Sequence, residues 1–166
     1  MGLFALLSGK NSKLLRLQKL IVKKSPNKLI MSEKQLMDTA RMAAKRMLEI
    51  CNDSIRLVDT TIKPDVFFSR LDLLLTNLAE LQELEKYISF SGSPSKSLTR
   101  IRTHKQKIIH DFLVRYHKAI VAQANAAKTP RGKEGKYKKF EESLRPYYSH
   151  MNAQNVHFVK SNSSIQ

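Results

Sequence analysis

The stretch PDVFFSRLDLLLTNLAELQELEKYISF, residues 64–90, decides the fold. Its apolar side chains recur every three or four residues, which is the repeat of an amphipathic helix. The repeat consists of Phe67, Leu71, Leu74, Leu78, Leu81 and Ile88, widened on both sides by Leu73, Leu75 and Leu84. An apolar face this wide is buried against more than one neighbouring element. We therefore expect a central core helix with Leu78 fully buried.

Sequence signals also mark where helices begin. Ser32 and Gln35 have the spacing of a capping box, and the apolar repeat behind them predicts a helix over residues 32–58. Pro64 fits the first turn of the central helix, because a residue without an N–H loses no hydrogen bond there. Both signals point to long helices with defined starts.

The segment after the central helix predicts another long helix. Ser93 is a candidate N-cap, Pro94 suits the first helical position, and the apolar repeat continues to about Ala126. Because the connection is short, residues 64–90 and 94–126 are expected to form an antiparallel hairpin. The sequence thus predicts an all-α protein, a helical bundle around a central antiparallel helical hairpin.

Two charged residues fall on the inner faces of this predicted hairpin. Glu85 lies on the apolar stripe of the central helix, and Arg102 lies on the inner edge of the next helix. A lone charge inside a helix interface would be costly. Antiparallel pairing brings the two residues to the same level, so we expect a partly buried ion pair between them.

The chain divides into three segments. We expect a basic amphipathic arm at residues 1–30, a helical bundle domain at 31–160 and a frayed tail at 161–166. Within the domain, residues 129–136 read TPRGKEGK, and their proline and two glycines predict a basic loop. A short helix interrupted by Pro146, and one or two further short helices that cap the bundle, are expected to follow.

The N-terminal arm is open to three interpretations. Residues 13–24 mix Leu, Ile and Val with five Lys and Arg, a pattern typical of a basic amphipathic helix. This helix could pack on the domain as an ordinary element. Alternatively, residues 1–24 could bind an anionic membrane surface or a partner protein. In the third interpretation, Met31 is the natural start of the protein.

The charge of the chain is strongly positive and unevenly spread. The net charge is +16, from 30 Lys and Arg against 14 Asp and Glu. Residues 1–30 carry seven basic and no acidic residues, and residues 93–128 carry eight against one. Residues 64–92, by contrast, carry two against five. Polyanions are the expected partners, whether nucleic acid, an acidic membrane or an acidic protein surface.

The residues that usually carry chemistry give little sign of catalysis. The single cysteine, Cys51, cannot form an intramolecular disulfide, which indicates a reducing, cytoplasmic compartment, and a buried inert thiol is the usual state of such a residue. Glycine-rich phosphate loops, nucleophile elbows and zinc-protease motifs are absent from the sequence. None of the five histidines lies three or four residues from another. We expect no enzyme activity, no cofactor and no metal site.

A basic stripe is the candidate polyanion-binding site. Four cations fall on one narrow side of the predicted helix 94–126, nearly opposite its apolar face. They are Lys96, Arg100, Lys107 and Lys118, and Asp111 interrupts them. Such a stripe can follow phosphates, although a charged outer face is also what any surface helix presents. Without aromatic or base-reading groups in the stripe, binding would be sequence-nonspecific and sensitive to salt.

A distinctive pattern centres on residues 60–68, which read Thr-Thr-x-x-Pro-Asp-x-Phe-Phe. It resembles a pattern in a family of small, uncharacterised, all-helical bacterial proteins, and the resemblance covers roughly residues 45–160. The similar stretches around this centre are 51–52, 59–74, 81–85, 90–94 and 112–115. The resemblance implies a helical domain without known activity, so it implies no functional residues.

These observations lead to an ordered set of expectations about function. The first is a non-enzymatic cytoplasmic interaction protein with an unidentified protein partner. The second is sequence-nonspecific nucleic-acid binding through the basic helix face. The third is a peripheral membrane protein that uses its N-terminal arm.

Overall fold

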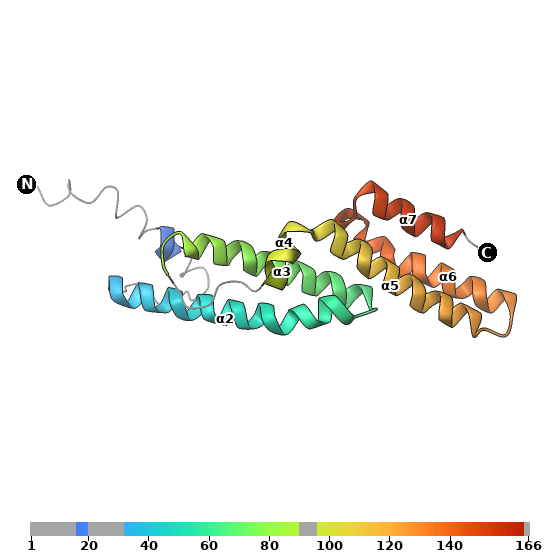
Figure 1. The fold of residues 1–166 in the computed structure, drawn as a ribbon, viewed down its shortest axis with the longest axis horizontal. Helices are drawn as coiled ribbons and strands as arrows, with labels where there is room; N and C mark the ends of the chain where they lie inside the picture. The colour runs from blue at the N-terminus through green and yellow to red at the C-terminus, as the bar shows by residue number, and fades with distance from the viewer. Residues whose placement is uncertain (1–15, 20–31, 90–95, 165–166) are drawn as a thin grey trace, which may run out of the picture.

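The computed structural model describes residues 16–19, 32–89 and 96–164, and the described chain is helical (Figure 1). Its elements follow one another along the chain, with bounds that match several of the start signals in the sequence. They are α2 (Glu33–Thr60), α3 (Pro64–Glu85), α4 (Lys96–Thr103), α5 (Lys105–Asn125), α6 (Pro130–Leu144), the 3-10 helix η1 (Arg145–His150) and α7 (Ala153–Ser163). The all-α prediction is therefore confirmed.

The helices α2 and α3 form a packed antiparallel hairpin (Figure 1). α2 begins with the expected capping box, in which Ser32 N donates to Gln35 Oε1 at 3.0 Å and Gln35 N donates to Ser32 Oγ at 3.3 Å. Pro64 occupies the first turn of α3, and Leu78 is buried at 3% exposure. The capping box, the role of Pro64 and the burial of Leu78 are all confirmed.

The partner of the central helix is not the one expected. α3 pairs with α2, while the predicted helix 94–126 breaks at His104 into α4 and α5. Only residues 61–63 join α2 to α3, so this connection holds the two helices together closely. Six polar residues in succession, 102–107, separate the buried Ile101 from the buried Ile108, and they offer no apolar contact to hold a straight helix on the hairpin. His104 leaves helical geometry at φ −122° and ψ 35°.

The break also removes the expected ion pair between Glu85 and Arg102. Both side chains are exposed, and among the described residues no ion pair joins them. The prediction was wrong because it assumed a continuous antiparallel partner for α3. Arg100, one turn of helix from the break, instead pairs with Asp59 at the end of α2.

Two predictions about the C-terminal region are also corrected. Residues 129–136 form no loop but the start of α6, where Thr129 Oγ1 accepts from Gly132 N at 3.1 Å and Pro130 takes the first turn. The N-cap and the proline start a helix there, and the glycines lie within it. α7 continues to Ser163, so half of the tail predicted to be frayed is helical. Residues 165–166 lie outside the described part.

The basic arm falls largely outside the described residues. Of residues 1–30, the structure describes 16–19, a helical turn in which Leu17 is 1% exposed and belongs to the hydrophobic core. This burial matches the interpretation in which the segment packs on the domain. None of the helices in the described ranges is long and apolar enough to cross a lipid bilayer.

Candidate nucleic-acid interface

Charge is unevenly divided between the two long described segments, residues 32–89 and residues 96–164. Residues 32–89, which hold the hairpin, carry eight Lys and Arg against ten Asp and Glu, a net charge of −2. Residues 96–164 carry fifteen against four, a net charge of +11. Figure 1 shows that the hairpin occupies one end of the elongated molecule, that α5, α6 and α7 occupy the other, and that α4 lies between them. We call residues 96–164 the basic half.

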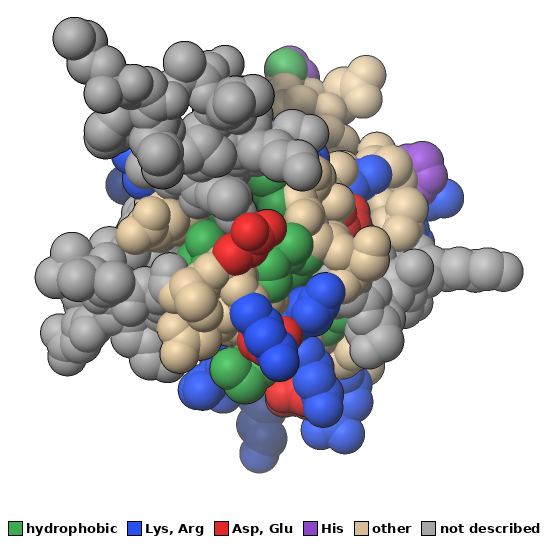
Figure 2. Space-filling view, turned by 90° about the vertical axis from the view of Figure 1, so that its left-hand side faces the viewer, with side chains coloured by type: hydrophobic (Ala, Val, Ile, Leu, Met, Phe, Trp, Pro, Cys, Tyr) green, Lys and Arg blue, Asp and Glu red, His purple; other side chains and the backbone are tan. Residues whose placement is uncertain are grey.

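The hairpin end carries charges of both signs. Figure 2 looks at this end and shows Lys and Arg side chains beside Asp and Glu side chains around an apolar patch. A shallow hollow of about 380 Å³ lies against α2 there, lined in part by Met42, Arg46 and Ile50. Met42 is 63% exposed.

The four cations of the predicted stripe are divided between two helices. Lys96 and Arg100 lie on α4, whereas Lys107 and Lys118 lie on α5. The side chains of Arg100, Lys107 and Lys118 are exposed, and that of Lys96 lies outside the described residues. Lys107 and Lys118 are eleven residues apart on one continuous helix, so they lie on the same side of it.

α6 adds cations that the sequence interpretation missed. Arg131 and Lys138 are exposed and stand seven residues apart, which places them on one side of the helix. Arg145 extends this spacing by seven more residues into η1 and is also exposed. The seven-residue spacing of these cations is not apparent if residues 129–136 are taken as a loop. The Thr129 cap followed by Pro130 was the signal that could have revealed it.

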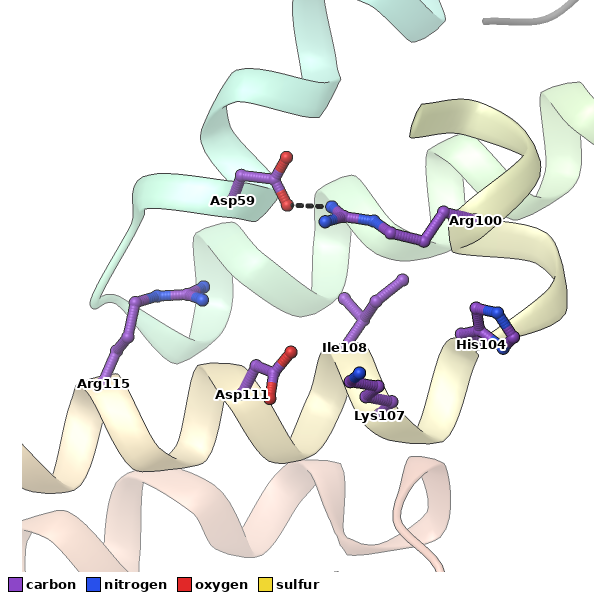
Figure 3. Close-up of a pocket in the computed structure, with 7 residues that line it drawn as sticks. All are labelled: Asp59, Arg100, His104, Lys107, Ile108, Asp111 and Arg115. Atoms are coloured by element: carbon purple, nitrogen blue, oxygen red, sulfur yellow. Dashed lines mark hydrogen bonds and ion pairs between the residues drawn. The ribbon is translucent and has the colours of Figure 1, made fainter. Parts of the chain in front are cut away.

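A cleft of about 390 Å³ opens where the end of α2 meets α4 and α5 (Figure 3). Four basic residues and two acidic residues line it, with one aliphatic side chain. They are Arg100, His104, Lys107, Arg115, Asp59, Asp111 and Ile108. The cleft therefore contains two members of the predicted stripe, Arg100 and Lys107, together with groups that the sequence interpretation did not join to them.

Two arginines build the cleft by attaching α4 and α5 to α2. Arg100 Nη2 lies 2.5 Å from Asp59 Oδ1, and Arg115 Nη2 donates to the carbonyl oxygen of Val58 at 3.0 Å. The Val58 carbonyl lies in the last turn of α2, where helix carbonyls lack helical partners. Arg115 Nε is buried and has no hydrogen-bond partner among the described residues. Both guanidinium groups are thus held in place before any ligand arrives.

The remaining polar groups of the cleft are not engaged. His104, Lys107 and Asp111 are exposed, and none has a side-chain hydrogen bond or ion pair with another described residue. Figure 3 shows Asp111 between Arg115 and Lys107 along α5, on the side that faces Asp59 and Arg100. Asp111 is the only acidic residue between Lys86 and Lys133 in the sequence. Asp111 is therefore the only carboxylate that α4 and α5 contribute to the cleft, the other being Asp59 of α2.

Neither a reactive thiol nor a set of metal ligands extends this cleft among the residues that the structure describes. Cys51 is buried, and burial raises the pKa of its thiol, which keeps it protonated and unreactive. Within the described ranges, no three His, Cys, Asp or Glu side chains gather closely enough to hold a metal ion. No protein-family model matches the sequence, and neither a curated protein nor a solved structure matches it.

Proposed function

We propose that this protein is a non-enzymatic binding protein that holds nucleic acid through its basic half, without reading base sequence. The observation that carries this proposal is the segregation of charge, +11 on residues 96–164 against −2 on residues 32–89. Cations gathered at one end of a molecule raise the local concentration of phosphates and release counterions when they bind them.

The surface of the basic half favours contacts with phosphates over contacts with bases. Among the described residues, every phenylalanine and tyrosine side chain is buried or partly buried, which leaves little aromatic surface on which a base could stack. The exposed groups are long cationic side chains such as Lys118, Arg131 and Lys138. Such groups fix a protein on the sugar–phosphate backbone and carry no sequence information.

The direct test is the salt dependence of binding to a labelled oligonucleotide, measured by fluorescence anisotropy. The logarithm of the association constant should fall linearly with the logarithm of the salt concentration between about 50 and about 200 mM. Two oligonucleotides of unrelated sequence should bind equally well. Poly-glutamate of the same net charge should compete weakly, and strong competition would favour an acidic protein partner. Absence of binding at low salt would refute the proposal.

Two triple variants that each remove three charges locate the interface. Lys118→Gln, Arg131→Gln and Lys138→Gln remove exposed cations from the basic half, and the combined variant should bind weakly with a shallower salt slope. The matched control changes exposed cations of α2 and should bind almost like the wild type. It combines Lys34→Gln, Lys45→Gln and Arg56→Gln. Equal losses in the two variants would show that only total charge matters.

A further inference from the structure

The cleft contains a group that phosphate binding alone does not explain. Asp111 is exposed within a surface of net charge +11 and lies in the same cleft as Arg100 and Lys107. A carboxylate repels phosphates, so its presence weakens any purely electrostatic contact there. Among the described residues, Asp111 makes no ion pair, even with Lys107 four residues earlier on α5. Asp111 is thus free to accept a hydrogen bond from a ligand.

The sugar–phosphate backbone of a nucleic acid offers one kind of donor to such a carboxylate. Phosphate oxygens only accept hydrogen bonds, and deoxyribose within a DNA strand has no hydroxyl group. Ribose within an RNA strand keeps its 2′-hydroxyl, which donates a hydrogen bond and distinguishes RNA from DNA. A carboxylate among phosphate-binding cations is therefore matched to RNA, where repulsion from phosphate is offset by this hydrogen bond.

The spacing of the cleft residues fits one ribonucleotide. Lys107 and Asp111 are four residues apart on α5, so their Cβ atoms lie about 5–6 Å apart on one side of the helix. In RNA, the 2′-hydroxyl and the 3′-phosphate are attached to neighbouring carbons of the same ribose. A phosphate bound by Lys107 would place its ribose hydroxyl within reach of Asp111. The volume of about 390 Å³ is in the range of small-ligand sites.

We propose that this cleft binds one ribonucleotide of an RNA strand, with the phosphate on Lys107 and Arg100 and the 2′-hydroxyl on Asp111. The proposal rests on the nucleic-acid function proposed above and narrows it to RNA. Arg100 and Arg115 are anchored to α2, so the walls of the cleft are positioned before the strand binds. The exposed cations of α5 and α6 hold the rest of the strand without distinguishing its sugar.

The experiment compares oligouridylate with oligodeoxyuridylate of about 12 nucleotides, which differ only in the 2′-hydroxyl. Wild-type protein should bind the RNA about tenfold more tightly, the effect of one hydrogen bond to a charged group. Asp111→Ala should abolish this preference, because it removes the hydrogen bond that only RNA makes, while loss of the negative charge favours binding of both strands. Asp111→Asn keeps an acceptor oxygen without the charge, so it should strengthen DNA binding and retain part of the preference.

The matched control is Glu134→Ala, which removes an exposed carboxylate from α6 outside the cleft. It should strengthen RNA and DNA binding equally and leave the preference intact. Asp111 and Glu134 are both exposed, so neither substitution should impair folding, which circular dichroism checks.

The possible results separate this inference from the general function. Equal binding of the two strands by the wild type would overturn the ribose contact and leave nucleic-acid binding standing. A preference that survives in Asp111→Ala would overturn the role of Asp111. Displacement of the RNA by uridine 3′-monophosphate at the same nucleotide concentration would assign the cleft to a free nucleotide instead. Binding of neither strand would refute both proposals.

Discussion

The ring of Phe67 lies flat on the ring of Phe112, with centroids 4.0 Å apart and an interplanar angle of 7°. Phe67 belongs to α3 and Phe112 to α5, and both are fully buried. The adjacent Phe68 stacks on Tyr147 of η1 at 4.4 Å. The two phenylalanines of the Thr-Thr-x-x-Pro-Asp-x-Phe-Phe pattern thus join the hairpin to the basic half through two different elements.

The first prediction tests this junction. Phe67→Ala should lower the free energy of unfolding by about 3–5 kcal/mol, because it removes a fully buried ring and its stacking contact with Phe112. Urea denaturation followed by circular dichroism measures the change. Ile62→Ala, at a position 45% exposed in the loop before α3, is the control and should change stability by less than about 0.5 kcal/mol. Similar effects of the two substitutions would contradict the junction.

The second prediction concerns the interior of the hairpin. Leu78 is 3% exposed in the middle of α3, and Leu78→Ala should cost about 2–5 kcal/mol of stability. The same denaturation measurement applies. An unchanged urea denaturation curve would show that the broad apolar face of α3 is not the centre of the core.

Local signals in the sequence were sufficient for the helices but not for their partners. One helix start is marked by the hydrogen bonds between Ser32 and Gln35, and another by Pro64, which has no N–H to leave unpaired in the first turn. The structure has both starts. The polar run 102–107 marks a place where a helix can break, but it does not show which elements α4 and α5 contact on either side of His104. Thr129 followed by Pro130 is a local signal for a helix start, whereas the two nearby glycines favour a loop. At these residues the start signal prevails in the structure.

The candidate site was predictable only in its exposed cations. The helical repeat placed Lys107 and Lys118 on one side of a helix, which the structure has. Asp59 lies 41 residues before Arg100, and Val58 lies 57 residues before Arg115, so no spacing rule could bring them together. The cleft exists because tertiary packing places the end of α2 beside α4 and α5. Only this packing brings Asp111 close to Asp59 and Arg100.

A third prediction concerns the thiol. Cys51 is fully buried, and burial raises its pKa above the ordinary value near 9, so the folded protein disfavours the thiolate. Reaction with a disulfide reagent around pH 8 should be slow in the native protein and fast in urea. Because the unfolded state ionises first, stability should fall as the pH rises above about 9. Rapid native labelling would contradict the burial.

The fourth prediction concerns acid. Burial lowers the pKa of His117 below its ordinary value of 6.5, and a hydrogen bond with the backbone of Asn162 opposes this shift. The unfolded state therefore takes up a proton at higher pH than the folded state. The free energy of unfolding should fall as the pH drops below about 6.5.

Two histidine variants separate this contribution from the others. His117→Gln should flatten the acid dependence of stability between about pH 7 and about pH 5. His157→Gln, which changes an exposed histidine of α7, is the matched control. Identical pH profiles for the wild type and His117→Gln would mean that His117 is not the group responsible.

The last prediction tests whether residues 130–144 form a helix from their first turn, against the loop that the sequence suggested for 129–136. Gly135 lies within α6, and a Cβ atom added there would meet nothing within 4 Å. Gly135→Ala should therefore stabilise the protein by about 0.5–1 kcal/mol, since glycine has the higher backbone entropy when unfolded. Gly132→Ala should gain less, because its Cβ would lie 3.1 Å from Thr129 Oγ1.

Gly135→Pro distinguishes a helix from a loop at this position. In a helix interior, proline removes a hydrogen bond and clashes with the carbonyl four residues earlier, at a cost of about 3 kcal/mol, whereas a loop would tolerate it. Thermal unfolding of the three variants should therefore rank Gly135→Ala above Gly132→Ala, with Gly135→Pro far below both.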